Sequence, residues 1–229
     1  FKLRFPISTS WTIWAPPGCV TIAVAQIMNY HQFPRNYCDW SLVNQYNPKK
    51  LLEENDQDVL DEVALLSKKV AGGCRVECNF FGSGETFSTP AKAKRFLRDM
   101  GYTGTEKHLG YDADVIKTTL NKGCPVFIGA LSSSNHGHAW VIDGYLNYEN
   151  IIKTYNGPAT LLETKTVNKL FVHCNWGWQS TRKNGYYASK VFDTRNGPAD
   201  LSGYPVATRG IDTKNYTWWF RIVTYNKPR

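Results

Sequence analysis

Cys19 has the sequence surroundings of a reactive cysteine. It follows Pro16-Pro17-Gly18, which does not continue a helix, and it begins the segment Cys19–His31, whose composition predicts one. A thiol at a helix N-terminus lies beside N–H groups without intrahelical partners and at the positive end of the helix dipole, and both favour the thiolate. Because the thiolate is a nucleophile, a histidine brought beside it would complete a pair that cleaves acyl bonds.

A strand far downstream supplies a suitable histidine. Alternation along His138–Asp143 places His138 on one face of the strand, and Gly137 before it lets backbone or substrate approach closely. Asn175 ends a second predicted strand, directly before the aromatic segment Trp176–Trp178. If the two strands are neighbours, the side-chain carbonyl of Asn175 can accept a hydrogen bond from the His138 imidazole, while an indole shields that bond from water.

The other four histidines fit this role less well. His136 and His173 are less favourably placed on their segments, and His31 and His108 fall in or near predicted helices. A single histidine in a sequence is most often structural, so the assignment of His138 depends on the pattern around it.

Helical patterns dominate the first half of the chain and strand patterns the second. The expected helices cover Cys19–His31, 55–69, a segment that begins at the cap residue Thr89, and 112–122. The expected strands are short, aromatic or β-branched, and they cover 125–131, 138–145, 170–176, 186–188 and 218–225. This order predicts an α+β fold with a mainly antiparallel sheet and a cleft where the two halves meet.

The chain of 229 residues has a formal net charge of +8, which raises the question of nucleic-acid binding. Its basic residues are spread along the sequence, and the densest group, Lys92–Arg98, surrounds Phe96 and Leu97 as on the solvated face of an amphipathic helix. We therefore expect no nucleic-acid partner. No apolar run approaches the roughly 20 residues that cross a bilayer, and the first residues show no cleavable signal pattern.

Six cysteines are too few for a disulfide scaffold in a chain of this length. If Cys19 is a free nucleophile, the five that remain cannot all pair within one chain. Cys74 and Cys78 are close in sequence, but no second Cys or His pair stands at zinc spacing. We expect buried thiols or one local bridge, and no metal.

Three motifs follow one another along the chain: Gly18–His31, Gly137–Gly144 and Asn175–Trp178. In their residues and in their order, they strongly resemble the streptopain family of bacterial papain-like cysteine proteases. Two weaker likenesses lie between them: Tyr37–Trp40 resembles a Tyr-x-Trp stretch of the family, and Val76–Gly84 resembles its loop before the substrate cleft. Chance agreement on three ordered motifs is improbable.

The resemblance, which runs from about Pro6 to Asp212, implies a papain-like two-lobed fold. Residues 1–229 would form a single catalytic domain, with a mostly helical lobe over about 1–122 and a mostly β lobe over about 123–229. The active site would lie between the lobes, with the nucleophile on the first and the His/Asn pair on the second.

The resemblance also implies roles for individual residues. Cys19 would be the nucleophile, His138 the general base and acid, Asn175 the orienting residue and Trp176 the indole beside it. Ser83, Gly84, Gly137 and Trp178 would contribute to the substrate groove, Gly137 through its backbone. The family commonly accepts a bulky apolar side chain just upstream of the scissile residue.

The implied activity is endopeptidase cleavage of proteins or peptides through a thioester acyl-enzyme, without a cofactor or metal. The family is made as a secreted zymogen whose own pro-segment blocks the cleft. The resemblance therefore implies the mature form of a secreted or cell-surface bacterial enzyme, and a candidate virulence factor. The sequence leaves the natural substrate, the activation site and the oligomeric state open.

One departure from the family concerns the oxyanion hole. The family supplies a Gln upstream of the cysteine, but residues 1–18 contain none, and Ile13 stands about where it is expected. The interval from Trp11 to Gly18 is also shorter than in many relatives. Either a stretch after Trp11 is missing from these residues, or oxyanion stabilisation rests on the Cys19 N–H and another donor. Losing one such donor typically costs roughly 10²–10³ in turnover.

Two other functions fit the same residues. One is a different acyl transfer by the same pair, as in a cell-wall amidase or transglutaminase, because one fold supports several chemistries. The other is a non-enzymatic binding or inhibitory relative, for which the missing Gln is the argument.

The segment 213–229 lies beyond the resemblance and is expected either to add an edge strand or to rest against the cleft.

Overall fold

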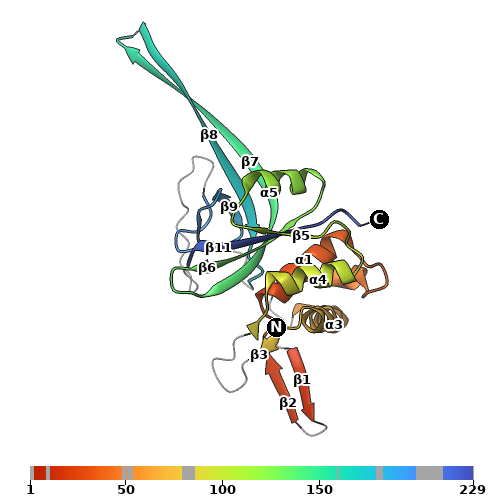
Figure 1. The fold of residues 1–229 in the computed structure, drawn as a ribbon. Coiled ribbons are helices and arrows are strands. Elements are labelled where there is room, and N and C mark those ends of the chain that lie inside the picture. Colours follow the sequence, from red (N-terminus) through yellow and green to blue (C-terminus); the bar gives the residue numbers. More distant parts are fainter. Residues whose placement is uncertain are drawn as a thin grey trace.

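The computed structural model describes residues 3–8, 11–47, 50, 54–78, 86–158, 160–178, 183–199 and 214–228. Within them the chain forms helices and one large antiparallel sheet, so the fold is α+β and compatible with the papain-like arrangement that the sequence predicts (Figure 1). Among the described residues, no helix is both long and apolar enough to cross a bilayer.

The long helices begin close to the residues that the sequence predicts, because local caps define their starts. Asp112 accepts hydrogen bonds from the first N–H groups of its helix, and Thr89 accepts one from the N–H of Lys92, with Pro90 in the first helical position. A short helix at Trp40 adds to those expected. The helices are α1 (Cys19–His31), α2 (Trp40–Val43), α3 (Gln57–Gly73), α4 (Pro90–Asp99) and α5 (Ala113–Asn121).

Every pairing in the large sheet is antiparallel, as expected. The strand order is β10-β11-β6-β7-β8-β9, and β5 also pairs with β11. The strands are β5 (Glu106–Leu109), β6 (Val126–Ser132), β7 (Gly137–Asn156), β8 (Thr160–Asn175), β9 (Gly185–Ala188), β10 (Phe192–Asp193) and β11 (Asn215–Thr224).

The C-terminal strand is not the edge strand that the sequence suggested. β11 lies inside the sheet, with β6 on one side and both β10 and β5 on the other. Its buried apolar residues, Tyr216, Phe220, Ile222 and Val223, provide the side chains for an interior position. The alternative expectation is confirmed in part, because Lys214 and Trp219 line the cleft described below.

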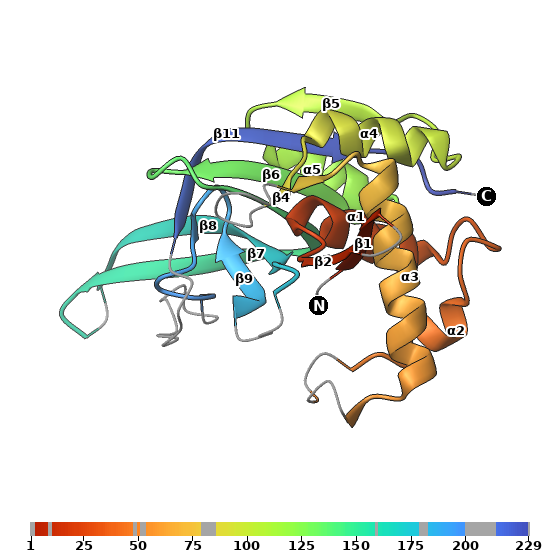
Figure 2. The ribbon, with the colours of Figure 1, turned by 90° about the horizontal axis from the view of Figure 1, so that it is seen from below.

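The sheet separates two hydrophobic cores, and β7 contributes to both. Ala139 and Val141 share one core with residues of α1, α3 and α4. α1 and α4 lie against this face of the sheet, and α3 packs against α1 (Figure 2). Trp140 and Ile142, which point the other way, pack with α5 and with aromatic residues of the later strands. This alternation brings the helix that begins at Cys19 against the strand that begins beside His138.

Four further strands form two small hairpins that the sequence patterns did not predict. β1 (Leu3–Ser8) pairs with β2 (Trp11–Ala15), and β3 (Glu77–Cys78) pairs with β4 (Thr86–Phe87) (Figure 1). β2 contains Ile13, whose side chain lies outside the described part of the structure.

Five cysteines carry free thiols in the described part of the structure. Cys74, Cys124 and Cys174 are buried, as expected, and Cys19 and Cys38 are partly buried.

Candidate active site

Gly18 sets the position of Cys19 at the start of α1. Its φ of 83° is a left-handed conformation that favours glycine, and a Cβ there would come within 2.5 Å of Thr86 Oγ1. No side chain caps the helix, and the first intrahelical bond runs from Ile22 N–H to the Gly18 carbonyl. The N–H groups of the first turn are therefore left without helical partners beside the thiol of Cys19.

The surroundings of the Cys19 thiol act on its pKa in opposite directions. Burial raises this pKa above its usual value, while hydrogen bonding from the backbone N–H groups of Ala139, Val20 and Cys19 itself lowers it. Burial is the larger of these effects on the thiol pKa. The involvement of Ala139 places the sulfur against the residue that follows His138.

His138 faces the same cleft as Cys19, and both residues line a cavity of about 560 Å³. Its ring is partly buried, and its Nε2 lies 3.0 Å from the carbonyl oxygen of Trp176. If Nε2 carries the proton, this bond leaves Nδ1 as the basic nitrogen of the neutral ring.

The acceptor at His138 Nε2 differs from the predicted one, which was the Asn175 side chain. Asn175 pairs across the ladder with Val141 and faces α1, so its Oδ1 accepts from Gln26 Nε2 at 2.9 Å. It also accepts from the N–H of Gly177 at 3.3 Å and from Asn184 Nδ2 at 3.2 Å. The chain turns at Gly177, and this turn brings the preceding carbonyl to the imidazole instead.

Aromatic rings surround the His138 imidazole. The ring of Trp178 lies 5.0 Å from it between centroids, that of Tyr216 5.8 Å, that of Trp176 5.9 Å and that of Trp140 6.2 Å. Trp176 is the predicted shielding indole, and its side chain is almost wholly buried. The other three rings extend the same enclosure, so water reaches the imidazole from the cleft side.

The cavity between the helical and β parts has a mixed lining. Gly137, one of the predicted substrate-groove residues, belongs to it, whereas Trp178 lies against the imidazole; Ser83 and Gly84 fall outside the described residues. The described lining comes from the start of α1 and the residues before it, the β3–β4 region, the start of α4, β6 with the turn after it, the start of β7, and β11 with the residue before it. The residues are Pro16, Gly18, Cys19, Val20, Val76, Thr86, Phe87, Ser88, Pro90, Gly129, Ala130, Leu131, Asn135, His136, Gly137, His138, Ala139, Lys214 and Trp219.

Sequence reasoning missed several residues of this site. Gln26 stands seven positions after Cys19, which is two helical turns, and this spacing on one helix face was the available signal. No local pattern identified Lys214 or Trp219, because β11 reaches the cleft only through its place in the sheet. His136, judged a poorer partner, lines the cavity and contacts the Ser134 hydroxyl at 3.0 Å through Nδ1.

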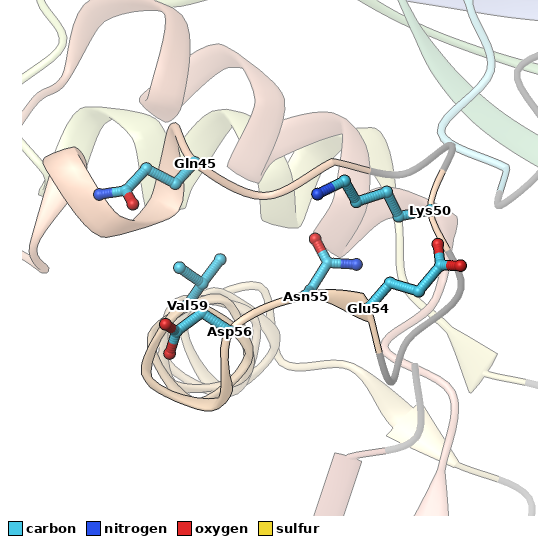
Figure 3. A pocket seen from close by; sticks show the side chains of 6 residues that line it. All are labelled: Gln45, Lys50, Glu54, Asn55, Asp56 and Val59. Atoms are coloured by element: carbon cyan, nitrogen blue, oxygen red, sulfur yellow. The ribbon is translucent and has the colours of Figure 1, made fainter.

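A second hollow of about 440 Å³ lies away from these residues, between the segment after α2 and the start of α3 (Figure 3). It is lined by Gln45, Lys50, Glu54, Asn55, Asp56 and Val59. None of these six side chains is a thiol or an imidazole, so this hollow offers no Cys–His pair.

Comparison with known proteins identifies the family of the chain. A search of curated proteins finds no match for the chain. The family model of the Peptidase C10 family matches residues 12–187, a range that contains Cys19, His138 and Asn175. This match covers more than half of the 229 residues. The chain therefore belongs to the Peptidase C10 family, the streptopain family of cysteine peptidases.

Proposed function

We propose that this cysteine peptidase is an endopeptidase in which Cys19 attacks the scissile carbonyl and His138 transfers the proton. The observation that carries the proposal is that both residues line one cleft, with the Cys19 sulfur against the N–H of Ala139. Burial raises the pKa of the thiol, so formation of the thiolate depends on a cation beside it. A protonated His138 supplies that cation, and the ion pair replaces the helix N-terminus as the main source of nucleophilicity.

The proposed reaction proceeds in two stages. The thiolate adds to the peptide carbonyl, and His138 gives its proton to the leaving amine as the C–N bond breaks and a thioester remains on Cys19. Water then gives a proton to His138 and attacks the thioester, which releases the carboxylic acid and regenerates the pair. The proposed substrates are proteins or peptides, as membership of a peptidase family implies.

The first turn of α1 is the proposed oxyanion site. Its N–H groups have no side-chain cap, and those of Cys19 and Val20 already point toward the sulfur. An oxyanion formed beside Cys19 would accept from such donors at the positive end of the helix. This arrangement supplies backbone donors in a chain whose residues 1–18 contain no Gln.

Asn175 and Trp176 are proposed to hold the imidazole rather than to react. The Trp176 carbonyl accepts from Nε2 of His138, and Asn175 fixes the strand end through its bonds to Gln26 and to the N–H of Gly177. The indole of Trp176 keeps water from the far side of the ring. Gly137, Ser83, Gly84 and Trp178 stay as proposed contributors to substrate binding.

We further propose that the enzyme is a secreted or cell-surface bacterial protein made as a zymogen. Family membership supports this, because the resemblance implies a pro-segment that blocks the cleft. The proposal is tested by expressing the coding region with any upstream segment and following the N-terminus of the product over time. Active protein that retains its upstream segment would contradict it.

The catalytic proposal is tested by labelling with an epoxide inhibitor of papain-like enzymes, followed by peptide mass spectrometry. We expect one label per chain, on Cys19, and loss of casein cleavage in the Cys19→Ala variant. Cys38→Ala is the matched control, because Cys38 is also partly buried but lies outside the cleft lining. A Cys19→Ala variant that still digests casein would overturn the assignment.

The same assay distinguishes other acyl transfers. An endopeptidase releases new peptide N-termini from denatured protein, whereas a transglutaminase or amidase releases ammonia or muropeptides. New N-termini are the expected product.

A further inference from the structure

β7 and β8 continue far beyond the rest of the sheet as a two-stranded ribbon (Figure 1). β6 covers the edge of β7 only as far as Ile142, and β9 covers that of β8 only from Phe171 onward. Among the described residues, no other strand pairs with 146–156 or with 160–169. The ribbon therefore presents two free edges, each with a row of backbone N–H and C=O groups.

The ribbon also exposes apolar side chains along much of its length. Ile151 is 53% exposed, Tyr155 52% and Leu162 61%. Ile151 and Tyr155 share one face of β7, and Leu161 stands opposite Tyr155 on the same face. A two-stranded hairpin alone is marginally stable in water, so a ribbon of this length with exposed apolar residues fits a segment that is covered in the working protein.

The two edges differ in regularity. On β8 an extra residue, Leu162, interrupts the register near the tip, and such bulges protect an edge from further pairing. From Gly144 to Asn156, β7 has no extra residue and keeps a regular edge. The β7 edge is therefore the better template for another strand.

The charges on β7 fit a second copy of the same strand. In an antiparallel pair centred on Ile151, Glu149 of each chain stands opposite Lys153 of the other, and Ile151 stands opposite itself. Within one chain these two charged residues stand opposite the neutral Asn168 and Thr164, so the ribbon does not already satisfy them. The ribbon carries Glu149 and Glu163 against Lys153, Lys165 and Lys169, a near balance that does not favour an anionic membrane as its partner.

We propose that the protein forms a two-fold dimer in which the β7 edges of two copies pair antiparallel around Ile151. The pairing joins the ribbons into one sheet of four strands in the order β8-β7-β7-β8. It satisfies the free backbone groups of β7 and forms two Glu149–Lys153 pairs across the axis.

Charge reversal tests the register. Analytical ultracentrifugation of the full chain, in the Cys19→Ala background to prevent self-digestion, should show a reversible dimer. Glu149→Lys and Lys153→Glu should each weaken it roughly 10-fold, because like charges then meet at two sites. An equimolar mixture of these two variants should restore association, since each opposes the other's charges, and the double variant should dimerise like the parent.

A cysteine on the axis provides an independent test. Residues directly opposite in a sheet have Cα atoms about 4.5–5.5 Å apart, which a disulfide spans. Ile151→Cys should therefore form a cross-linked dimer on mild oxidation. Thr154→Cys is the matched control, because residue 154 would face residue 148 and not itself, and the parent shows what its own thiols contribute.

Several outcomes would overturn the proposal. A parent protein that stays monomeric at all concentrations would overturn it. A dimer that neither charge variant weakens, or that fails to cross-link through Ile151→Cys, would also overturn it. A monomer that co-sediments with phosphatidylcholine or phosphatidylserine vesicles would assign the ribbon to a membrane instead. Casein cleavage by the charge variants with Cys19 restored should be unchanged, so a loss of dimer stays separate from a loss of peptidase activity.

Discussion

Gln26 Nε2 donates a hydrogen bond of 2.9 Å to Asn175 Oδ1, and this bond joins the helix that begins at Cys19 to the strand end beside His138. The two residues are 149 positions apart in the chain. Asn175 Oδ1 also accepts from the N–H of Gly177, so one side-chain oxygen links α1 to the turn that carries the Trp176 carbonyl. The helix that begins at Cys19 and the strand end that contacts His138 are thus joined by a contact that involves neither residue.

Removing this link should reduce turnover more than binding. We expect Asn175→Ala and Gln26→Ala each to lower kcat roughly 10- to 100-fold with little change in KM, because a small displacement of reacting groups is costly. The double variant should lose little more than Asn175→Ala alone, since that change already removes the bond to Gln26. Steady-state kinetics on a peptide substrate provide the measurement. Additive losses, or a change confined to KM, would contradict the positioning role.

The dependence of the thiolate on His138 can be measured directly. Burial raises the pKa of the Cys19 thiol, so without an imidazolium the thiolate fraction at neutral pH is small. We expect His138→Ala to slow alkylation of Cys19 near pH 7 by more than 10-fold and to move the midpoint of the pH–rate profile upward. His136→Ala, at another histidine of the cavity lining, is the control. Equal profiles for His138→Ala and the parent would count against the pair.

Gly18 gives a prediction that combines stability and activity. Its φ of 83° and the 2.5 Å approach of a Cβ to Thr86 Oγ1 make Gly18→Ala both strained and crowded. We expect a loss of about 1–3 kcal/mol in the free energy of unfolding together with a fall in kcat/KM, because Cys19 follows directly. Urea denaturation and peptide kinetics check both. Gly110→Ala is the matched control, with φ of 83° but open space around the Cβ, and it should keep full activity.

The sequence predicted those parts of the fold that local chemistry determines. Thr89 and Asp112 cap helices through their own side chains, and Gly18 precedes α1, so these starts are visible without tertiary information. The beginning of β7 was predicted for a similar reason, because the short apolar run Ala139–Ile142 is typical of a strand, and in the structure it is buried on both faces. Both cleft residues, Cys19 and His138, lie in such segments.

The features of the structure that the sequence did not predict depend on long-range contacts. The strand β7 was expected to end near Tyr145, since 146–156 mixes polar and apolar residues and has β8 as its only partner among the described residues. The position of β11 inside the sheet follows from its pairing with β6, which no local pattern reveals. The Trp176 carbonyl was not predicted as the acceptor at His138 Nε2, because a turn at Gly177 brings it to that nitrogen.

The aromatic enclosure of His138 gives a prediction that distinguishes structure from chemistry. Trp140 is fully buried, so Trp140→Ala should cost about 3–5 kcal/mol of stability. Trp178 is only partly buried, and its ring is the nearest to the imidazole at 5.0 Å. We expect Trp178→Ala to keep most of its stability but to lose activity, because water gains access to the ring, whereas Trp178→Phe should retain it. Thermal unfolding and peptide kinetics separate these effects, and a fully active Trp178→Ala would refute the shielding role.

His31 makes the folded protein sensitive to acid. Burial of the ring is the main cause, and the nearby charge of Lys227 the lesser one, that lowers the pKa of His31 to about 4, against 6.5 for the unfolded chain. Between these values the unfolded chain binds the proton and the folded protein does not, so stability falls as pH decreases from about 6.5 to about 4. His173 acts in the opposite direction, because its hydrogen bond to Asp143 raises its pKa and adds stability on the acid side.

A comparison that changes residue 31 alone isolates the first effect. His31 is half-buried beside Tyr225, whose hydroxyl lies 3.1 Å from Nε2, and glutamine can replace that hydrogen bond without a titratable group. We expect the parent to lose on the order of 1–2 kcal/mol more than His31→Gln between pH 7 and pH 4.5. Urea denaturation at half-unit pH steps measures the difference. If both proteins lose stability in parallel across this range, His31 does not bind a proton on unfolding and its neutral state in the fold is not the cause of acid sensitivity.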